Sequence, residues 1–76
     1  MIVDDHEVVR RGIADVVDRS DGLSVVAEAG SVAEAKRRAA LVRPEVALVD
    51  LQLPDGTGID IITWLRTELP ETRSVV

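Results

Sequence analysis

The chain has 76 residues, of which 14 are acidic and 9 basic, and its formal net charge at pH 7 is −5. This acidity, together with a single aromatic residue, argues against a module that binds the phosphate backbone of nucleic acids. Cysteine is absent, which excludes disulfide bonds, zinc–thiolate sites and cysteine nucleophiles and fits a reducing compartment. The N-terminal residues resemble neither a secretory signal nor a membrane span. We therefore expect one small cytoplasmic domain over residues 1–76, without membrane contact.

Apolar, strand-like runs alternate with helical patterns along the chain. The run at residues 1–3 predicts a first strand. From about His6 to Arg19, apolar residues recur at i, i+4, i+7 and i+8, which predicts a helix with one apolar face. That face consists of Val9, Ile13, Val16 and Val17. The turn residues at 20–22 lead to residues 23–29, which we interpret as a half-buried strand.

The middle of the chain predicts a capped helix followed by a buried strand. Ser31 and Glu34 have the S-x-x-E spacing of a capping box, and the helix that they begin ends before Pro44. Residues 46–49 form a continuous apolar run, which is the pattern of a strand covered on both faces of a parallel sheet. The helix is expected to face inward with Val32, Ala35, Ala39 and Val42.

The last part of the chain repeats this alternation. A loop with two glycines at 56–58 precedes a third helix, which ends at Pro70. Residues 72–76 start a fourth strand. Alternating strands and helices with short connections indicate a parallel sheet with right-handed crossovers, so the expected fold class is α/β. The third helix is expected to present Ile62, Leu65 and Leu69 on one face.

Three carboxylates come at the ends of predicted strands. Asp4 and Asp5 follow the first strand, and Asp50 follows the third. Ligands of open parallel sheets bind beyond the carboxyl ends of the strands, where the strand order reverses. If the two strands are neighbours, these carboxylates repel one another, and the repulsion is relieved either by protonation of one of them or by a hard divalent cation such as Mg²⁺. A carboxylate beside such a cation can form an aspartyl phosphate. The alternative is that all three cap helices or solvate strand ends.

Three stretches carry a resemblance to a known family. "VDDHEVVRRG" at 3–12, "SVAEA" at 31–35 and "VALVDLQLPDGTGID" at 46–60 resemble the receiver domain of two-component response regulators. The first stretch is most similar to the subfamily with a LuxR-type helix-turn-helix output domain. The resemblance implies a flavodoxin-like, CheY-like doubly wound parallel sheet. It also implies that the sheet is incomplete at its C-terminal end and that the receiver is truncated after the fourth strand.

The resemblance also implies roles for individual residues. Asp50 is the expected phosphoacceptor, which receives its phosphoryl group from a sensor histidine kinase. Asp5 is expected to bind Mg²⁺ directly, Asp4 directly or through water, and Gln52 through its backbone carbonyl, with Asp50 completing the metal site. His6 we interpret as a partly exposed residue of the first helical turn, the alternatives being a phosphohistidine or a metal ligand.

As a member of this family the protein would be a signalling component and not a turnover enzyme. It would control an output function, transcription above all, and would contact DNA only through an output domain that this chain lacks.

The chain departs from the family pattern in two respects. A complete receiver has a Ser or Thr at the end of its fourth strand and a Lys at the end of its fifth, and both contact the phosphoryl group. The only lysine here, Lys36, belongs to the second helix, and Ser74 comes too early in the fourth strand. These departures leave a second hypothesis open. It is a receiver remnant that no longer switches and acts as an interaction or dimerisation module, with the exposed edge of the fourth strand as a site for a homodimer.

Overall fold

The computed structural model describes residues 1–76, and a four-stranded parallel sheet forms its centre. The sheet order is β2-β1-β3-β6, so the chain runs outward from β1 to β2 and then returns past β1 to β3 and β6. The order therefore reverses between β1 and β3. The strands are β1 (Ile2–Val3), β2 (Glu28–Ala29), β3 (Val46–Val49) and β6 (Arg73–Val75). The expected parallel α/β fold is confirmed.

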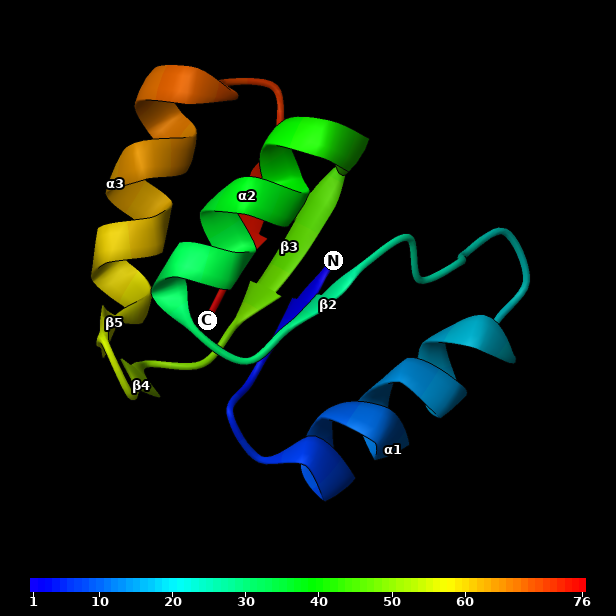
Figure 1. Ribbon diagram of the computed structural model, residues 1–76. Helices are drawn as coiled ribbons and strands as arrows, with labels where there is room; N and C mark the ends of the chain where they lie inside the picture. Colours follow the sequence, from blue (N-terminus) through cyan, green and yellow to red (C-terminus); the bar gives the residue numbers. More distant parts are fainter.

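Three helices connect the strands. They are α1 (Glu7–Asp18), α2 (Val32–Val42) and α3 (Gly58–Glu68), close to the predicted ranges. α2 and α3 lie side by side, whereas α1 lies apart from them beside β1 (Figure 1). The crossover from β1 to β2 runs across the sheet in the opposite direction to the crossovers that lead to β3 and β6. Since such crossovers are right-handed, α1 lies on the opposite face of the sheet from α2 and α3. None of the helices has the length and apolar character that a membrane crossing requires.

Local capping begins both α2 and α3. The Ser31 hydroxyl accepts a hydrogen bond from the Glu34 amide at 3.1 Å, as predicted. The Glu34 carboxylate accepts from the Gly30 amide at 2.9 Å, one residue before the N-cap position. α3 has a reciprocal capping box between Thr57 and Asp60, which was not predicted from the sequence. The hydrogen bonds to the Glu34 and Asp60 amides satisfy donors that the first helical turn leaves without partners.

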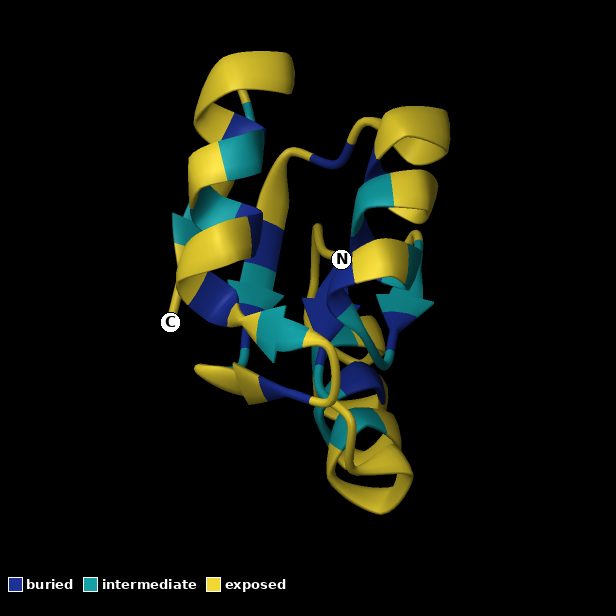
Figure 2. Ribbon diagram, turned by 60° about the vertical axis from the view of Figure 1, so that its left-hand side comes forward, coloured by how far each residue is buried: buried dark blue, intermediate teal, exposed yellow.

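The hydrophobic core lies between the sheet and the helices α2 and α3. Buried residues gather along the sheet and on the helix surfaces that face it (Figure 2). Ile61 and Leu65 are almost fully buried on α3, whereas Ile62 is only half-buried. Ile62, predicted to share one face with Leu65 and Leu69, lies at the margin of the buried face. Ile61 takes the central position there, because Ile61, Leu65 and Leu69 have the i, i+4, i+8 spacing of that face. Val42, predicted to face inward on α2, is also exposed.

The other face of the sheet is largely open. In β3, Ala47 and Val49 are buried, but Val46 is 44% exposed and Leu48 is half-buried. The prediction that this strand is covered on both faces is therefore wrong, because α1 packs against β1 and leaves β3 uncovered. Of the four residues of the apolar face predicted for α1, two are exposed and two are half-buried, and Ala14 is the only buried residue of that helix.

Two further segments differ from the sequence-based expectation. Of residues 23–29, only Glu28 and Ala29 pair with β1. The stretch after β3 forms a small antiparallel pair, β4 (Gln52–Leu53) and β5 (Gly56–Thr57), where a loop was expected. Two-residue strands are too short for the periodicity that identifies a strand from sequence.

Two isoleucines of α3 test the position of the core. Replacing Ile61, which is fully buried, with Ala should lower the free energy of unfolding by about 2 to 5 kcal/mol, because the deletion leaves a cavity. Ile59→Ala is the matched control, since Ile59 is 58% exposed on the same helix. Urea denaturation of both variants measures the difference. Equal losses for the two would contradict this description of the core.

Candidate functional site

The carboxyl ends of β1 and β3 bring three aspartates together. The two strands are neighbours, and Val3 pairs with Val49. The Asp50 amide donates a hydrogen bond to the Val3 carbonyl oxygen at 2.9 Å, which places the residues after both strands at one rim. Single ligand atoms of Asp4, Asp5, His6 and Asp50 all lie within 4.8 Å of one another. The predicted convergence of the three carboxylates is confirmed.

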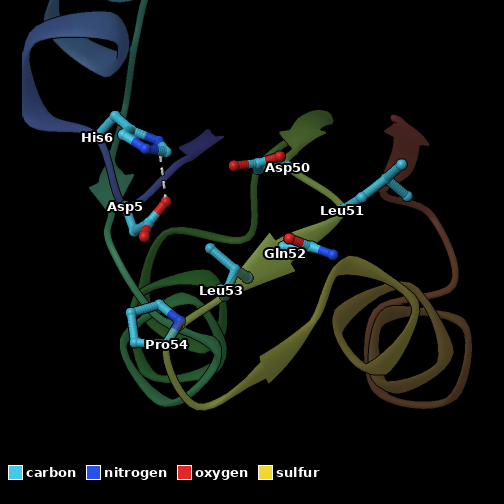
Figure 3. Close-up of a pocket in the computed structure, with 7 residues that line it drawn as sticks. All are labelled: Asp5, His6, Asp50, Leu51, Gln52, Leu53 and Pro54. Atoms are coloured by element: carbon cyan, nitrogen blue, oxygen red, sulfur yellow. Dashed lines mark ion pairs between the residues drawn. The ribbon is translucent and has the colours of Figure 1, made fainter.

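These residues line an open pocket at the switch point of the sheet. Asp5 and His6 come from the loop after β1, and Asp50 comes from the end of β3 (Figure 3). Gln52 lines the same pocket from β4, as do Leu51, Leu53 and Pro54. All four residues predicted for the metal and phosphoryl site therefore lie in or beside one pocket, since Asp4 belongs to the same cluster.

His6 contacts both members of the acid pair. Its Nδ1 lies 3.1 Å from Oδ1 of Asp4 and 3.1 Å from Oδ1 of Asp5, while its backbone amide donates to Oδ1 of Asp4 at 2.8 Å. The hydrogen bond to Asp4 and the negative charge of Asp5 raise the pKa of His6 above its ordinary value. The side chain is 71% exposed, as expected for a first-turn residue, but its contact with both carboxylates was not foreseen.

The donor set fits a small, hard divalent cation. Three carboxylates supply oxygen ligands, and the open side of the pocket leaves room for the water molecules that Mg²⁺ keeps. The side chains of Asp4 and Asp5 are 14% and 32% exposed, so their charges repel one another in a partly desolvated place. A cation at this position would relieve that repulsion.

Arg10 holds the backbone of the acid pair and was missed from the sequence. Its Nη1 donates to the Asp4 carbonyl oxygen at 2.8 Å, and its Nε donates to the Glu28 carboxylate at 3.0 Å. The guanidinium group thus connects α1, the loop after β1 and the first residue of β2. Sequence spacing alone does not pair residues that are 18 positions apart, so no local signal identifies this contact.

Asp55 caps α2 from the turn between β4 and β5. Its carboxylate oxygens accept hydrogen bonds from the amides of Val32 at 2.7 Å and Ala33 at 3.0 Å. These two hydrogen bonds lower the pKa of Asp55 below its ordinary value. Asp55 therefore ties the loop that follows Asp50 to the start of α2. An Asp between Pro and Gly is a common turn residue, and its contact with α2 was not predicted from the sequence.

Gly58 allows α3 to begin directly against the backbone of Asp50. A Cβ atom at this position would overlap the Asp50 carbonyl oxygen and lie 3.1 Å from a methyl group of Val49. The Gly58 amide also donates to the Leu51 carbonyl oxygen at 2.8 Å. Close contact between α3 and residues 50–51 therefore fixes the segment that presents the Asp50 carboxylate.

The fold and the site together define a class of protein. A doubly wound parallel sheet with a cluster of acidic residues at its switch point is typical of receiver domains, which relay signals. The sequence profile described as "Response regulator receiver domain" matches residues 1–76, and the chain belongs to this family.

Known proteins extend this assignment. The chain is 49% identical over 75 residues to the DNA-binding transcriptional activator DevR/DosR of Mycobacterium tuberculosis, covering 99% of this chain and 35% of that protein. It superposes with a TM-score of 0.91 on a LuxR-family two-component response regulator from Aurantimonas sp. SI85-9A1, at 36% identity, covering 97% of this chain and 53% of that one.

A third relative is known in complex with DNA. RcsB of Salmonella enterica serovar Typhimurium, bound to promoter DNA in the presence of the phosphomimetic BeF₃⁻, superposes with a TM-score of 0.87 at 25% identity, covering 96% of this chain and 42% of that one. The chain thus spans about a third of the length of its curated relative and about half of the solved chains. The likeness to LuxR-type response regulators, first indicated by the "VDDHEVVRRG" stretch, is confirmed.

Two glycine substitutions test the contact between α3 and Asp50. Gly58→Ala should destabilise the protein by about 1 to 3 kcal/mol, because the new methyl group forces α3 away from the Asp50 backbone. Gly12→Ala is the control, since nothing lies within 4 Å of its Cβ position and Ala favours the interior of α1 by roughly 0.5 to 1 kcal/mol. Thermal unfolding followed by circular dichroism should therefore shift in opposite directions for the two variants.

The carboxylate of Asp55 predicts a dependence of stability on pH. A lowered pKa in the folded state means that the ionised form stabilises the fold at pH values above the ordinary pKa of 3.8. That contribution is lost as the pH falls below 3.8 towards the pKa of the folded state. Asp55→Asn should therefore lower the melting temperature at pH 7, and its difference from wild type should shrink in acid. Asp21→Asn, in the exposed turn after α1, is the control. A difference that stays constant down to the acid range would contradict the cap.

Proposed function

We propose that the chain is the phosphoacceptor part of a two-component response regulator and that Asp50 receives the phosphoryl group. Residues 1–76 form one receiver unit in this proposal. The single observation that carries it is the position of the Asp50 carboxylate, which lies at the switch point within 4.8 Å of ligand atoms from Asp4 and Asp5. Its backbone is held by β1 on one side and by α3 on the other.

The proposed reaction is a direct transfer from a phosphohistidine of a sensor kinase. A carboxylate oxygen of Asp50 attacks phosphorus and forms the new P–O bond, while the P–N bond breaks and its electron pair stays on the departing imidazole. Asp4, Asp5, Asp50 and the backbone carbonyl of Gln52 would hold Mg²⁺. The cation, when bound, supplies positive charge to the phosphoryl oxygens. The protein itself accepts a single phosphoryl group and is not a turnover enzyme.

The output of this switch is proposed to be transcriptional. DevR/DosR is a DNA-binding transcriptional activator, and RcsB binds promoter DNA in the presence of a phosphomimetic, which supports a similar role for the protein that contains this chain. The net charge of −5 favours DNA contact through residues outside these 76. A cytoplasmic location, where sensor kinases present their phosphohistidines, completes the proposal.

Two observations favour the second hypothesis, a non-switching interaction module. Lys36 lines a different pocket, together with Asp55 and Trp64, and so does not reach towards Asp50. Ser74 pairs with Ala47, three residues before Asp50 on the neighbouring strand. Phosphorylation of Asp50 distinguishes the two hypotheses.

Acetyl phosphate tests the phosphoacceptor. The protein that contains this chain, incubated with acetyl phosphate and MgCl₂, should gain one phosphoryl group, which intact-mass measurement detects. The adduct should be labile to base, because it is an acyl phosphate. Asp50→Asn should abolish labelling and Asp21→Asn should leave it unchanged. Labelling that survives Asp50→Asn would refute Asp50 as the acceptor, and a wild-type protein that remains unlabelled would favour the interaction module.

A further inference from the structure

We propose that the imidazole of His6 occupies the cation position between Asp4 and Asp5 and competes there with Mg²⁺. This inference rests on the proposed metal site and adds a residue that sets its affinity. Nδ1 of His6 lies at the same distance, 3.1 Å, from one carboxylate oxygen of each aspartate (Figure 3 shows the contact with Asp5).

The chemistry of the contact determines which group donates. Ionised carboxylates accept hydrogen bonds only, so the proton between them and the imidazole belongs to Nδ1. The same oxygen of Asp4 also accepts from the His6 backbone amide at 2.8 Å. A cation that bridges these two Oδ1 atoms would occupy the position that Nδ1 now holds, since Nδ1 lies 3.1 Å from each of them. The imidazole must therefore leave before a cation can take this position.

Nothing else in the fold holds the His6 side chain in place. The residue is the N-cap of α1 with an extended backbone, but its side chain forms no capping hydrogen bond. Its side chain is 71% exposed and forms no part of the hydrophobic core. The imidazole can therefore rotate into solvent without disturbing α1 or the sheet. Because only the acid pair holds the imidazole, a metal ion that binds the acid pair can displace it.

The effect of this competition on Mg²⁺ affinity can be calculated. The apparent affinity equals the intrinsic affinity multiplied by the fraction of time for which the site is free. If the imidazole occupies the acid pair for about 70 to 90% of the time, its removal should tighten Mg²⁺ binding about three- to tenfold. The opposite effect is expected if His6 is a metal ligand, because its removal would then weaken binding.

Calorimetric titration with MgCl₂ at one fixed pH tests this inference. His6→Ala should bind Mg²⁺ about three- to tenfold more tightly than wild type. Arg11→Gln is the control for charge, since Arg11 is 70% exposed on the first turns of α1 and its ion-pair partner is Glu7, outside the acid pair. It should bind Mg²⁺ as wild type does. Asp5→Asn should lose most of the affinity.

Nuclear magnetic resonance of the wild-type protein provides a second readout. Saturating Mg²⁺ should move the His6 ring signals to positions typical of a solvent-exposed histidine, because the hydrogen bonds to the aspartates are lost. Ring signals that do not respond to Mg²⁺ would overturn the inference.

The calorimetric outcomes separate the inference from the proposed function. Equal or weaker binding by His6→Ala, with binding still lost in Asp5→Asn, would refute competition and leave the metal site standing. Equal tightening by Arg11→Gln would assign the effect to net charge and also refute it. Identical titrations of wild type, His6→Ala and Asp5→Asn would overturn both the inference and the metal site.

Discussion

The pairing of β1 with β3 is the constraint on which the site depends. Hydrogen bonds from the Leu48 amide to Met1 and from the Asp50 amide to Val3, both 2.9 Å long, set the register of the two strands. A slip by one residue would move Asp50 about 3.3 Å along the strand and turn Val49 out of the core. The burial of Val3 and Val49 against α2 and α3 therefore also fixes the distance between the acid pair and Asp50.

Backbone contacts hold the carboxylates where their mutual repulsion would otherwise separate them. Arg10 binds the Asp4 carbonyl oxygen, Gly58 lets α3 pack on the Asp50 carbonyl group, and Asp55 ties the following turn to α2. None of these contacts uses a carboxylate oxygen of the three clustered aspartates. The carboxylates of Asp4 and Asp5 instead contact His6, while the backbone segments that carry all three aspartates are held by other parts of the fold.

The two faces of the sheet differ in how far they are covered. On one face, small fully buried residues allow α2 and the sheet to approach closely; these are Ala29, Ala35, Ala39 and Ala47. On the other face α1 covers little beyond β1, and Val9, Val16 and Val46 are exposed. The pocket beside Asp5, His6 and Asp50 adjoins the better-packed part, because Leu53 of β4 lines the pocket and also belongs to the hydrophobic core.

Local sequence patterns determined the order of elements and the identity of the clustered aspartates. Helical periodicity and the Ser31 cap place α1 and α2 within a residue or two, since these signals depend only on neighbours in the chain. The position of Asp4, Asp5 and Asp50 at strand ends follows from the apolar runs before them, and the quoted stretches identify the family.

Only the tertiary structure decided which contacts complete the site. Three features depend on which segments become neighbours in space. They are the burial of Ile61 in place of Ile62, the exposed face of β3 and the hydrogen bond from Arg10 to the Asp4 carbonyl oxygen. The contact of His6 with the acid pair depends on the path of the backbone between β1 and α1. Sequence periodicity predicts which side of a helix or strand is apolar. Which residues of other elements pack against that side is decided only by the tertiary structure.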